Sequence, residues 1–304
     1  MQIKIKDSLK TVLKIAIVLL IFFFLIAGLF RTWNQIDLDK LNFRWLPLLL
    51  SVLVLILYFC FFVACWLAIL KNLGVELPFS QGFKIVFYSQ MGKYLPGKFW
   101  ALAAKVLLCQ KLAIPKSTSF FAIGLEVGLT TVAGILVFLT GLLMEKDYGL
   151  TVQPVYLGMT AILLLVAVHP KILSKVLNFF LTIFKKEKVK IELTFSQLAT
   201  LLGYYFLNWL FFGIAFFFLV NSISSFPFMK VPILAGSFAI SVVAGMVSIF
   251  APGGMGVREA ILVLFLHNFF PLPLAIAISL ISRLWITLVE LIMVGISAKI
   301  KWAI

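Results

Sequence analysis

The sequence has few of the residues from which most enzyme sites are built. Its 304 positions include two histidines, three cysteines and 11 acidic residues. His169 and His267 are far apart, and no cluster of Cys, His, Asp and Glu has metal-ligand spacing. The odd number of cysteines, in or next to apolar segments, argues against a disulfide framework. We therefore expect no metal site and no cofactor, and the lack of a GxxxxGK[ST] loop argues against ATP-driven transport by this chain alone.

Charge is also scarce. Charged residues make up 12% of the chain and hydrophobic residues 63%, whereas soluble domains have about 25% and about 45–50%. The apolar residues form long runs that do not alternate with polar ones, which predicts helices rather than a β-barrel, because a backbone in hydrocarbon must satisfy its own hydrogen bonds. The sequence predicts an all-α polytopic integral membrane protein.

Eight apolar runs are candidate membrane-spanning helices. The run at 257–270 would form about 21 Å of helix, which is short of the ~30 Å hydrocarbon core, so it is a candidate half-span. Residues 80–110 are apolar but interrupted by charge, Pro and Gly, and we interpret them as a hairpin that enters and leaves on one side. The eight runs are 11–30, 46–70, 118–143, 154–170, 197–220, 231–250, 257–270 and 273–298.

The chain is expected to form one transmembrane domain over residues 1–304, with no soluble domain. A cytoplasmic linker at 171–195 divides a first half, about 1–170, from a second half, about 196–304. The most polar part of the linker, 185–192, is expected to be solvated and to touch anionic lipid.

The net charge of +15 is distributed like that of a membrane protein. The lysines lie beside apolar runs rather than on a soluble basic face, so anionic membrane lipids are the expected partner and nucleic acid is not. Of the 26 basic residues, 20 fall on one side of the predicted membrane, five fall on the other, and Arg283 lies inside an apolar run. The positive-inside rule makes the more basic side cytoplasmic and places both termini there, in a cell (inner) membrane. The 20 basic residues on that side are Lys4, Lys6, Lys10, Lys14, Lys71, Lys84, Lys93, Lys98, Lys105, Lys111, Lys116, Lys171, Lys175, Lys185, Lys186, Lys188, Lys190, Arg258, Lys299 and Lys301.

Three ionisable residues lie within predicted spans, where a charge costs at least ~2.5–3.5 kcal/mol. Arg283 and Glu290 share one helical face of the last span, and Glu126 lies in the span at 118–143. Gly124 and Gly128 beside Glu126 predict a surface that another helix can approach closely. Two interpretations stay open: Arg283 forms a structural ion pair with Glu290 or Glu126, or these residues line a polar cavity for a charged substrate.

Two Pro-Gly breaks interrupt apolar surroundings, at 92–100 and 250–259. Pro removes an amide hydrogen and Gly permits φ > 0, so the backbone must break there. A helix that starts after each break would direct its free N–H groups at the break, which favours an anion. An ordinary cytoplasmic turn is the alternative, but breaks at corresponding positions of two halves favour a transporter's binding site. The candidate substrate-binding residues are therefore Lys93, Pro96, Gly97, Lys98, Gly253, Gly254, Arg258 and Glu259, with Glu126, Arg283 and Glu290 in the core.

These segments resemble the flippase-like transmembrane family of lysylphosphatidylglycerol synthases, also called multiple peptide resistance factors. The resemblance rests on Gly92–Lys98 with Trp100, on Pro252–Glu259 and on Ser282-Arg283-Leu284. It implies two related halves with re-entrant helical hairpins, and a role in moving a phospholipid or lipid-linked glycan across the bilayer. The family often has an acidic-Arg pair where this chain has Glu126-Val127. It also includes synthases with a soluble aminoacyl-transfer domain, whose activity is not carried over to this chain.

The function that we expect is a lipid flippase or scramblase-like carrier for an anionic phospholipid or lipid-linked glycan, not an enzyme. One alternative is a non-catalytic membrane partner of a separate lipid synthase or glycosyltransferase. Another is a membrane-embedded enzyme on a lipid-linked substrate, for which no nucleophile with its base is evident. A homodimer is an open assembly state.

The charge bias makes a testable prediction about orientation. In a background without the native cysteines, single cysteines at Gln2, Lys186 and Ile304 should be shielded from an impermeant thiol reagent in intact cells, whereas one at Lys146 should react. Reaction at Lys186 from outside would reverse the orientation.

Overall fold

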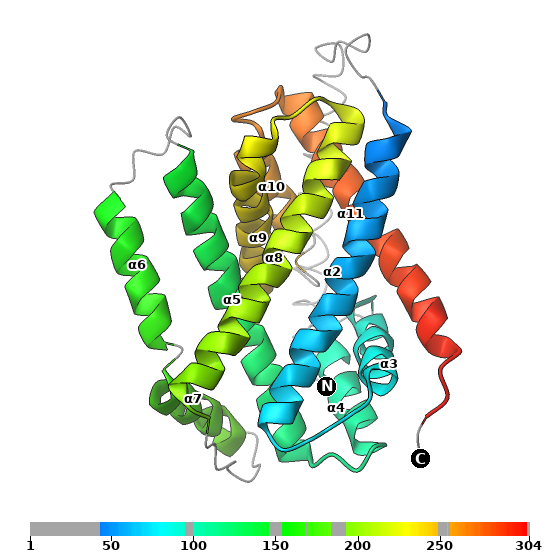
Figure 1. Ribbon diagram of the computed structural model, residues 1–304, viewed down its shortest axis with the longest axis vertical. Coiled ribbons are helices and arrows are strands. Elements are labelled where there is room, and N and C mark those ends of the chain that lie inside the picture. The colour runs from blue at the N-terminus through cyan, green and yellow to red at the C-terminus, as the bar shows by residue number, and fades with distance from the viewer. Residues whose placement is uncertain are drawn as a thin grey trace, which may run out of the picture.

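A computed structural model describes residues 43–94, 100–145, 154–167, 169–183, 193–248, 254 and 256–302. These residues form α-helices joined by short 3₁₀ turns and loops, with no strand among them, which confirms the all-α prediction. Four helices of 27–29 residues make the frame (Figure 1): α2 (Trp45–Asn72), α5 (Lys116–Met144), α8 (Phe195–Ile223) and α11 (Leu272–Ala298).

Shorter helices lie between the long ones. α3 (Phe79–Gln90), the 3₁₀ turn Met91–Tyr94 and α4 (Trp100–Gln110) come between α2 and α5. The 3₁₀ turn Phe228–Lys230, α9 (Val231–Val247) and α10 (Val257–Leu266) come between α8 and α11. The order long, short, short, long thus occurs twice, and each Pro-Gly break falls between two short helices. The two groups are joined by α6 (Pro154–Ala167) and α7 (Pro170–Ile183).

Local sequence sets several helix ends. At the start of α8, Thr194 Oγ1 accepts a hydrogen bond from the Gln197 N–H at 3.3 Å, and Gln197 Oε1 accepts one from the Thr194 N–H at 2.8 Å. This reciprocal capping satisfies two amides that a helix leaves free. α2 ends at Asn72, and Gly74 just beyond it adopts a φ of +78°, which suits glycine. The Val75 N–H donates back to the Leu70 carbonyl at 2.9 Å.

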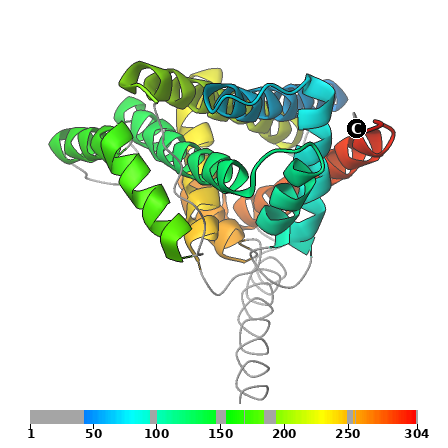
Figure 2. The ribbon, with the colours of Figure 1, turned by 90° about the horizontal axis from the view of Figure 1, so that it is seen from below.

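The helices pack around a central pair. α2 and α8 lie side by side and run in opposite directions, and the Arg44 N–H at the start of α2 donates to the Ser222 carbonyl near the end of α8 at 2.9 Å. α5 packs against α8 and α9, while α3 packs against α4, α2 and α11. Seen from below, α6 and α7 lie on the other side of α5 from α3 and α4 (Figure 2). Large aromatic side chains fill the centre, including Trp66, Tyr205, Phe216 and Phe238.

Five described helical segments are long and apolar enough to cross a membrane: 45–72, 116–144, 195–223, 228–247 and 272–298. They match five of the eight predicted spans. α6 has 14 residues and α10 has ten, about 21 Å and about 15 Å of helix, so neither reaches across a ~30 Å core when straight. The predicted span at 11–30 lies outside the described residues, and the prediction of eight spans is not confirmed.

The segment predicted as a linker, 171–195, is partly helical. α7 occupies most of its first half, and α8 begins at Phe195. Its sequence has a basic residue at Lys171 and another at Lys175, both exposed, with Phe179 also exposed. The most polar part of the predicted linker, 185–192, lies outside the described residues, so the prediction of a solvated linker there stays a prediction.

Glycines bring α5 and α9 close together, but Gly128 is not one of them. A Cβ atom on Gly141 would lie 2.7 Å from the Pro232 carbonyl oxygen, and one on Gly236 would lie 2.7 Å from Phe138 Cα. A Cβ atom on Gly128 would meet no atom within 4 Å. The prediction that Gly128 marks a close helix approach is therefore wrong. The contact lies further along α5, where backbone meets backbone.

This difference between two glycines of one helix is testable. Gly141→Leu should lower the free energy of unfolding in detergent by about 1–3 kcal/mol, because the added side chain overpacks a backbone contact. Gly128→Leu should change it little, since the added atoms point into open space. Equal losses for the two variants, in denaturant titrations followed by circular dichroism, would contradict the α5–α9 packing.

Candidate functional site

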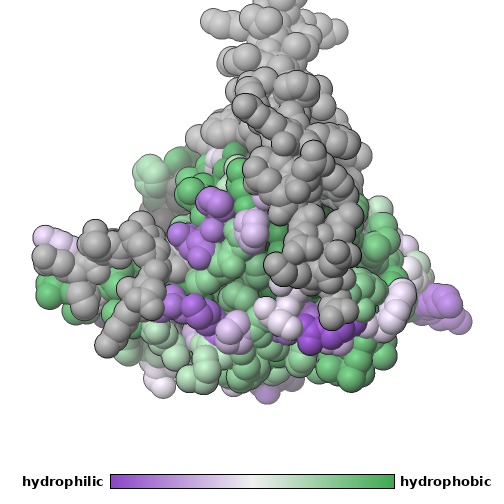
Figure 3. Space-filling view, turned by 90° about the horizontal axis from the view of Figure 1, so that it is seen from above, coloured by the Kyte–Doolittle hydropathy of each residue, from purple (hydrophilic) through white to green (hydrophobic). Residues whose placement is uncertain are grey.

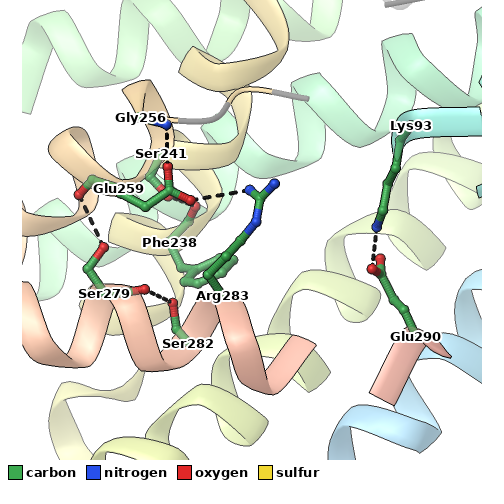
Figure 4. A network of polar contacts seen from close by, with 9 residues as sticks. All are labelled: Lys93, Phe238, Ser241, Gly256, Glu259, Ser279, Ser282, Arg283 and Glu290. Atoms are coloured by element: carbon green, nitrogen blue, oxygen red, sulfur yellow. Dashed lines mark hydrogen bonds and ion pairs between the residues drawn. The ribbon is translucent and has the colours of Figure 1, made fainter. Parts of the chain in front are cut away.

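The last long helix carries a half-buried arginine and a buried glutamate, each paired with a different short-helix segment. Arg283 Nη1 donates to Glu259 Oε1 of α10 at 3.2 Å. Two turns further along α11, Glu290 forms an ion pair with Lys93, in the 3₁₀ turn after α3 (Figure 4). α11 is therefore linked through charge to both segments that flank the Pro-Gly breaks.

Glu259 is held by its backbone as well as by Arg283. It lies in the first turn of α10, where the Gly256 N–H donates to Glu259 Oε2 at 2.6 Å. Gly256 adopts φ of +82°, a conformation that a side chain would strain. The Ser279 hydroxyl of α11 donates to the Glu259 carbonyl oxygen at 3.2 Å. The Glu259 side chain is 2% exposed and is fixed by two helices.

Arg258, one residue earlier, has no such partner. Its guanidinium carbon lies 4.5 Å from the ring centroid of Phe238 on α9, within cation–π range. Its Nη2 atom is buried and has no hydrogen-bond partner among the described residues. The charges of Glu259, Glu290 and Arg283 all act on it. A buried guanidinium nitrogen without an acceptor is costly, and among the described residues no acceptor is supplied to it.

We call Lys93, Arg258, Glu259, Arg283 and Glu290 the central charge cluster. It contains three cations and two carboxylates, and Lys93 and Arg258 are close enough for their charges to interact. Residues that flank the two Pro-Gly breaks are thus brought together around α11. The excess of positive charge and the donors of Arg258 suit an oxyanion such as a phosphate.

The structure locates some of the other predicted site residues. Gly254 packs against α9 with φ of +69°, and a Cβ atom there would lie 2.9 Å from Gly245 Cα. Pro96, Gly97, Lys98 and Gly253 lie outside the described residues. Among the residues that the structure does describe, no group of three or more His, Cys, Asp or Glu could hold a metal ion.

Glu126 belongs to a second group of charges. Lys105 of α4 forms a 2.5 Å ion pair with Glu126 of α5, and its Nζ lies 4.3 Å from the ring centroid of Trp66. The sequence analysis counted Lys105 among the cytoplasmic charges and missed this pair. The available signal was a single lysine inside an apolar helix, Trp100–Gln110, which is the same signal that identified Arg283.

Two sequence predictions are corrected by these contacts. Arg283 does not pair with Glu290 or Glu126, because Glu259 comes closer from α10 while the other two carboxylates pair with lysines. Arg258 was counted among the charges on the cytoplasmic side of the membrane. Instead its guanidinium packs on Phe238, eight residues into α9, within the helical interior.

The Arg283–Glu259 pair predicts a specific rescue. Arg283→Met should destabilise the folded protein by roughly 3–5 kcal/mol, because it leaves Glu259 charged and buried without its partner. Adding Glu259→Gln should recover part of that loss, measured as the free energy of unfolding in detergent. Adding Glu290→Gln instead should recover none, since Glu290 is paired with Lys93. Equal recovery by both would refute the assigned partner.

Comparison with known proteins bears on the whole chain. No curated protein matches it. A family model described as the lysylphosphatidylglycerol synthase TM region matches residues 11–294, which include both Pro-Gly breaks and all five members of the central charge cluster. The resemblance noted in the sequence is therefore confirmed, and the chain belongs to the family of the lysylphosphatidylglycerol synthase transmembrane region.

Proposed function

We propose that this protein is a flippase or scramblase-like carrier that moves an anionic lipid across the membrane, with the headgroup phosphate bound at Arg258. The observation that carries the proposal is the buried Nη2 atom of Arg258, which has no acceptor among the described residues. Arginine presents parallel donors that match phosphate oxygens in pairs, so a headgroup would satisfy it.

The charges around Arg258 favour an anionic ligand. Glu259 is occupied by Arg283 and by the Gly256 amide, and Glu290 is occupied by Lys93. Both carboxylates of the cluster therefore already have cationic partners, which leaves Arg258 as the cation in excess. Its place in the first turn of α10 adds the partial positive charge of a helix N-terminus.

The repeated helix order supports two related halves with re-entrant hairpins. α4 packs on α5 as α10 packs on α11, and each first short helix contacts the last long helix of the other half, α3 with α11 and α9 with α5. Because α2 and α8 are antiparallel, the pair α3–α4 starts from one end of the molecule and the pair α9–α10 from the other (Figure 1). Hairpins that enter from opposite faces would have their breaks meet near the midplane, as in transporters built from inverted repeats.

The surface and the charge bias suggest how the protein lies in the membrane. Large apolar side chains such as Leu57, Leu284 and Leu288 are exposed along the long helices, as contact with lipid requires. Figure 3 views the end of the molecule from above, where hydrophilic residues form separate groups among apolar ones. The end at which α2 and α11 finish bears Lys71, Lys84, Lys111 and Lys299. We assign that end to the cytoplasm and the protein to a cell (inner) membrane. The headgroup site would then lie inside the membrane, between its two aqueous surfaces.

The proposal is tested by the purified chain in liposomes of stated composition. Transbilayer movement of fluorescent phosphatidylglycerol should be faster than in protein-free vesicles, and Arg258→Ala should slow it about tenfold or more, because a charge-assisted hydrogen bond contributes ~1.5–3 kcal/mol. Arg258→Lys should restore part of the rate, since lysine supplies charge without the paired donors. Lys98→Arg should be tolerated.

The matched control is Arg44→Ala. Arg44 is an exposed arginine that donates to Ser225 at 2.9 Å, far along the chain from the breaks, so its loss should leave lipid movement unchanged. Wild-type rates in folded Arg258→Ala protein would refute the headgroup site. No movement by the wild-type chain would refute the carrier and favour the role of a membrane partner for a separate synthase or glycosyltransferase.

A further inference from the structure

The second charged group has features that the headgroup site does not explain. Lys105 and Glu126 form an ion pair between α4 and α5, with side chains only 7% and 12% exposed. The described cations that act on Arg258, Lys93 and Arg283, both belong to the central charge cluster. The Lys105–Glu126 pair contributes to neither Pro-Gly break and lies on different helices from Arg283 and Glu259. A buried pair of this kind in a membrane protein needs a role of its own.

Lys105 has a second partner ready beside Glu126. Its Nζ lies 4.3 Å from the centroid of the Trp66 ring, close enough for a cation–π contact. If Glu126 became neutral, Lys105 could keep its charge against the Trp66 ring. Breaking this ion pair would therefore cost less than breaking one whose cation has no alternative partner.

Buried polar atoms without partners lie on α5 and on two helices that pack against it, α2 and α8. Thr130 Oγ1, one turn beyond Glu126 on α5, is buried and has no hydrogen-bond partner, and the same holds for Trp66 Nε1 and Tyr205 Oη in the described structure. The charge of Glu126 acts on Tyr205. A protonated carboxyl group needs an acceptor for its new O–H, and the oxygens of Thr130 and Tyr205 are free to accept it.

The remaining titratable groups around Glu126 are neutral or distant. The charge of Glu126 acts on Cys65 of α2 and Cys109 of α4. Thiols are uncharged near pH 7, as is the phenol of Tyr205. α9 has no titratable side chain over Val231–Val247. α6 and α7 contribute Tyr156, Lys171 and Lys175, which are all exposed. Among these groups only Glu126 and Lys105 carry charge in the interior.

From this geometry we infer that Glu126 is a proton-binding site that couples lipid movement to a proton gradient. One proton passes from water to a carboxylate oxygen of Glu126, which becomes a neutral acid. Lys105 keeps its proton and shifts to Trp66, so the tie between α4 and α5 is released. Because α4 is the second helix of the pair that contains the first Pro-Gly break, this release lets that pair move against α5. The coupling rests on the proposed carrier function, whereas the proton binding does not.

Proton binding is tested without any lipid movement. Infrared difference spectra of the purified protein, recorded as pH is lowered, should show the carbonyl band of a newly protonated carboxylic acid. Glu126→Gln should remove a component of that band. Glu145→Gln should not remove it: Glu145, at the end of α5, pairs with Lys230 at 3.2 Å, and Lys230 lies 5.0 Å from the Phe269 ring centroid. The Glu145–Lys230 pair therefore has the same residue types and the same kind of ring contact as the Glu126–Lys105 pair, but it lies at the end of α5. An identical band in wild-type and Glu126→Gln protein would overturn the inference.

Coupling is tested in liposomes with an imposed proton gradient. Phosphatidylglycerol movement by the wild-type and Glu145→Gln proteins should be several-fold faster with the gradient than without it. Movement by Glu126→Gln should be the same in both conditions, because its neutral side chain mimics the protonated state permanently. A gradient response in Glu126→Gln equal to that of the wild type would overturn the coupling. If no variant moves lipid, the carrier function fails, and the infrared band alone decides whether Glu126 binds a proton.

Discussion

α11 carries an arginine and a glutamate through an otherwise apolar interior, and each must meet an opposite charge there. A lone charge in this environment costs several kcal/mol, and removing one member of a buried pair leaves that cost uncompensated. Arg283 meets Glu259 of α10, and Glu290 meets Lys93 beside the first break. The positions of both short-helix pairs relative to α11 therefore depend on these two contacts. The glycine contacts between α5 and α9 bring the backbones of those two helices close together.

Among the described charges of this region, Arg258 differs in having a buried donor, Nη2, without a hydrogen-bond acceptor. Phe238 shields one face of its guanidinium, and Glu259, the adjacent residue, is turned to Arg283 and to the Gly256 amide. The protein thus uses its carboxylates to hold helices together and leaves one arginine with an open hydrogen-bonding position. This division of roles is the basis of our proposal that Arg258 binds an external anion.

The sequence was sufficient for the coarse architecture. Long apolar runs predicted five helices that the structure has, and Pro and Gly located both breaks, because hydrophobic length and backbone chemistry act locally. The partners of the buried charges could not be obtained in the same way. Helical spacing shows that Arg283 and Glu290 share a face, but not which helix packs against that face, so Glu259 and Lys93 were not chosen as partners. The length of α10 could not be predicted from the sequence either. The apolar run that contains it continues to residue 270, yet the helix ends at Leu266. Lys105 was misplaced because charge counting assigns every lysine near a loop to the surface.

The central claim is that a lipid phosphate is bound by Arg258, and the dipolar coupling between nitrogen-15 and phosphorus-31 measures that contact directly. The chain has four arginines, Arg31, Arg44, Arg258 and Arg283, so selective labelling of arginine is close to site-specific. In liposomes of phosphatidylglycerol, solid-state NMR should show strong phosphorus dephasing of one guanidinium signal, and that signal should disappear in Arg258→Lys protein. Dephasing that is absent from the wild type, or that persists unchanged in Arg258→Lys, would contradict the claim.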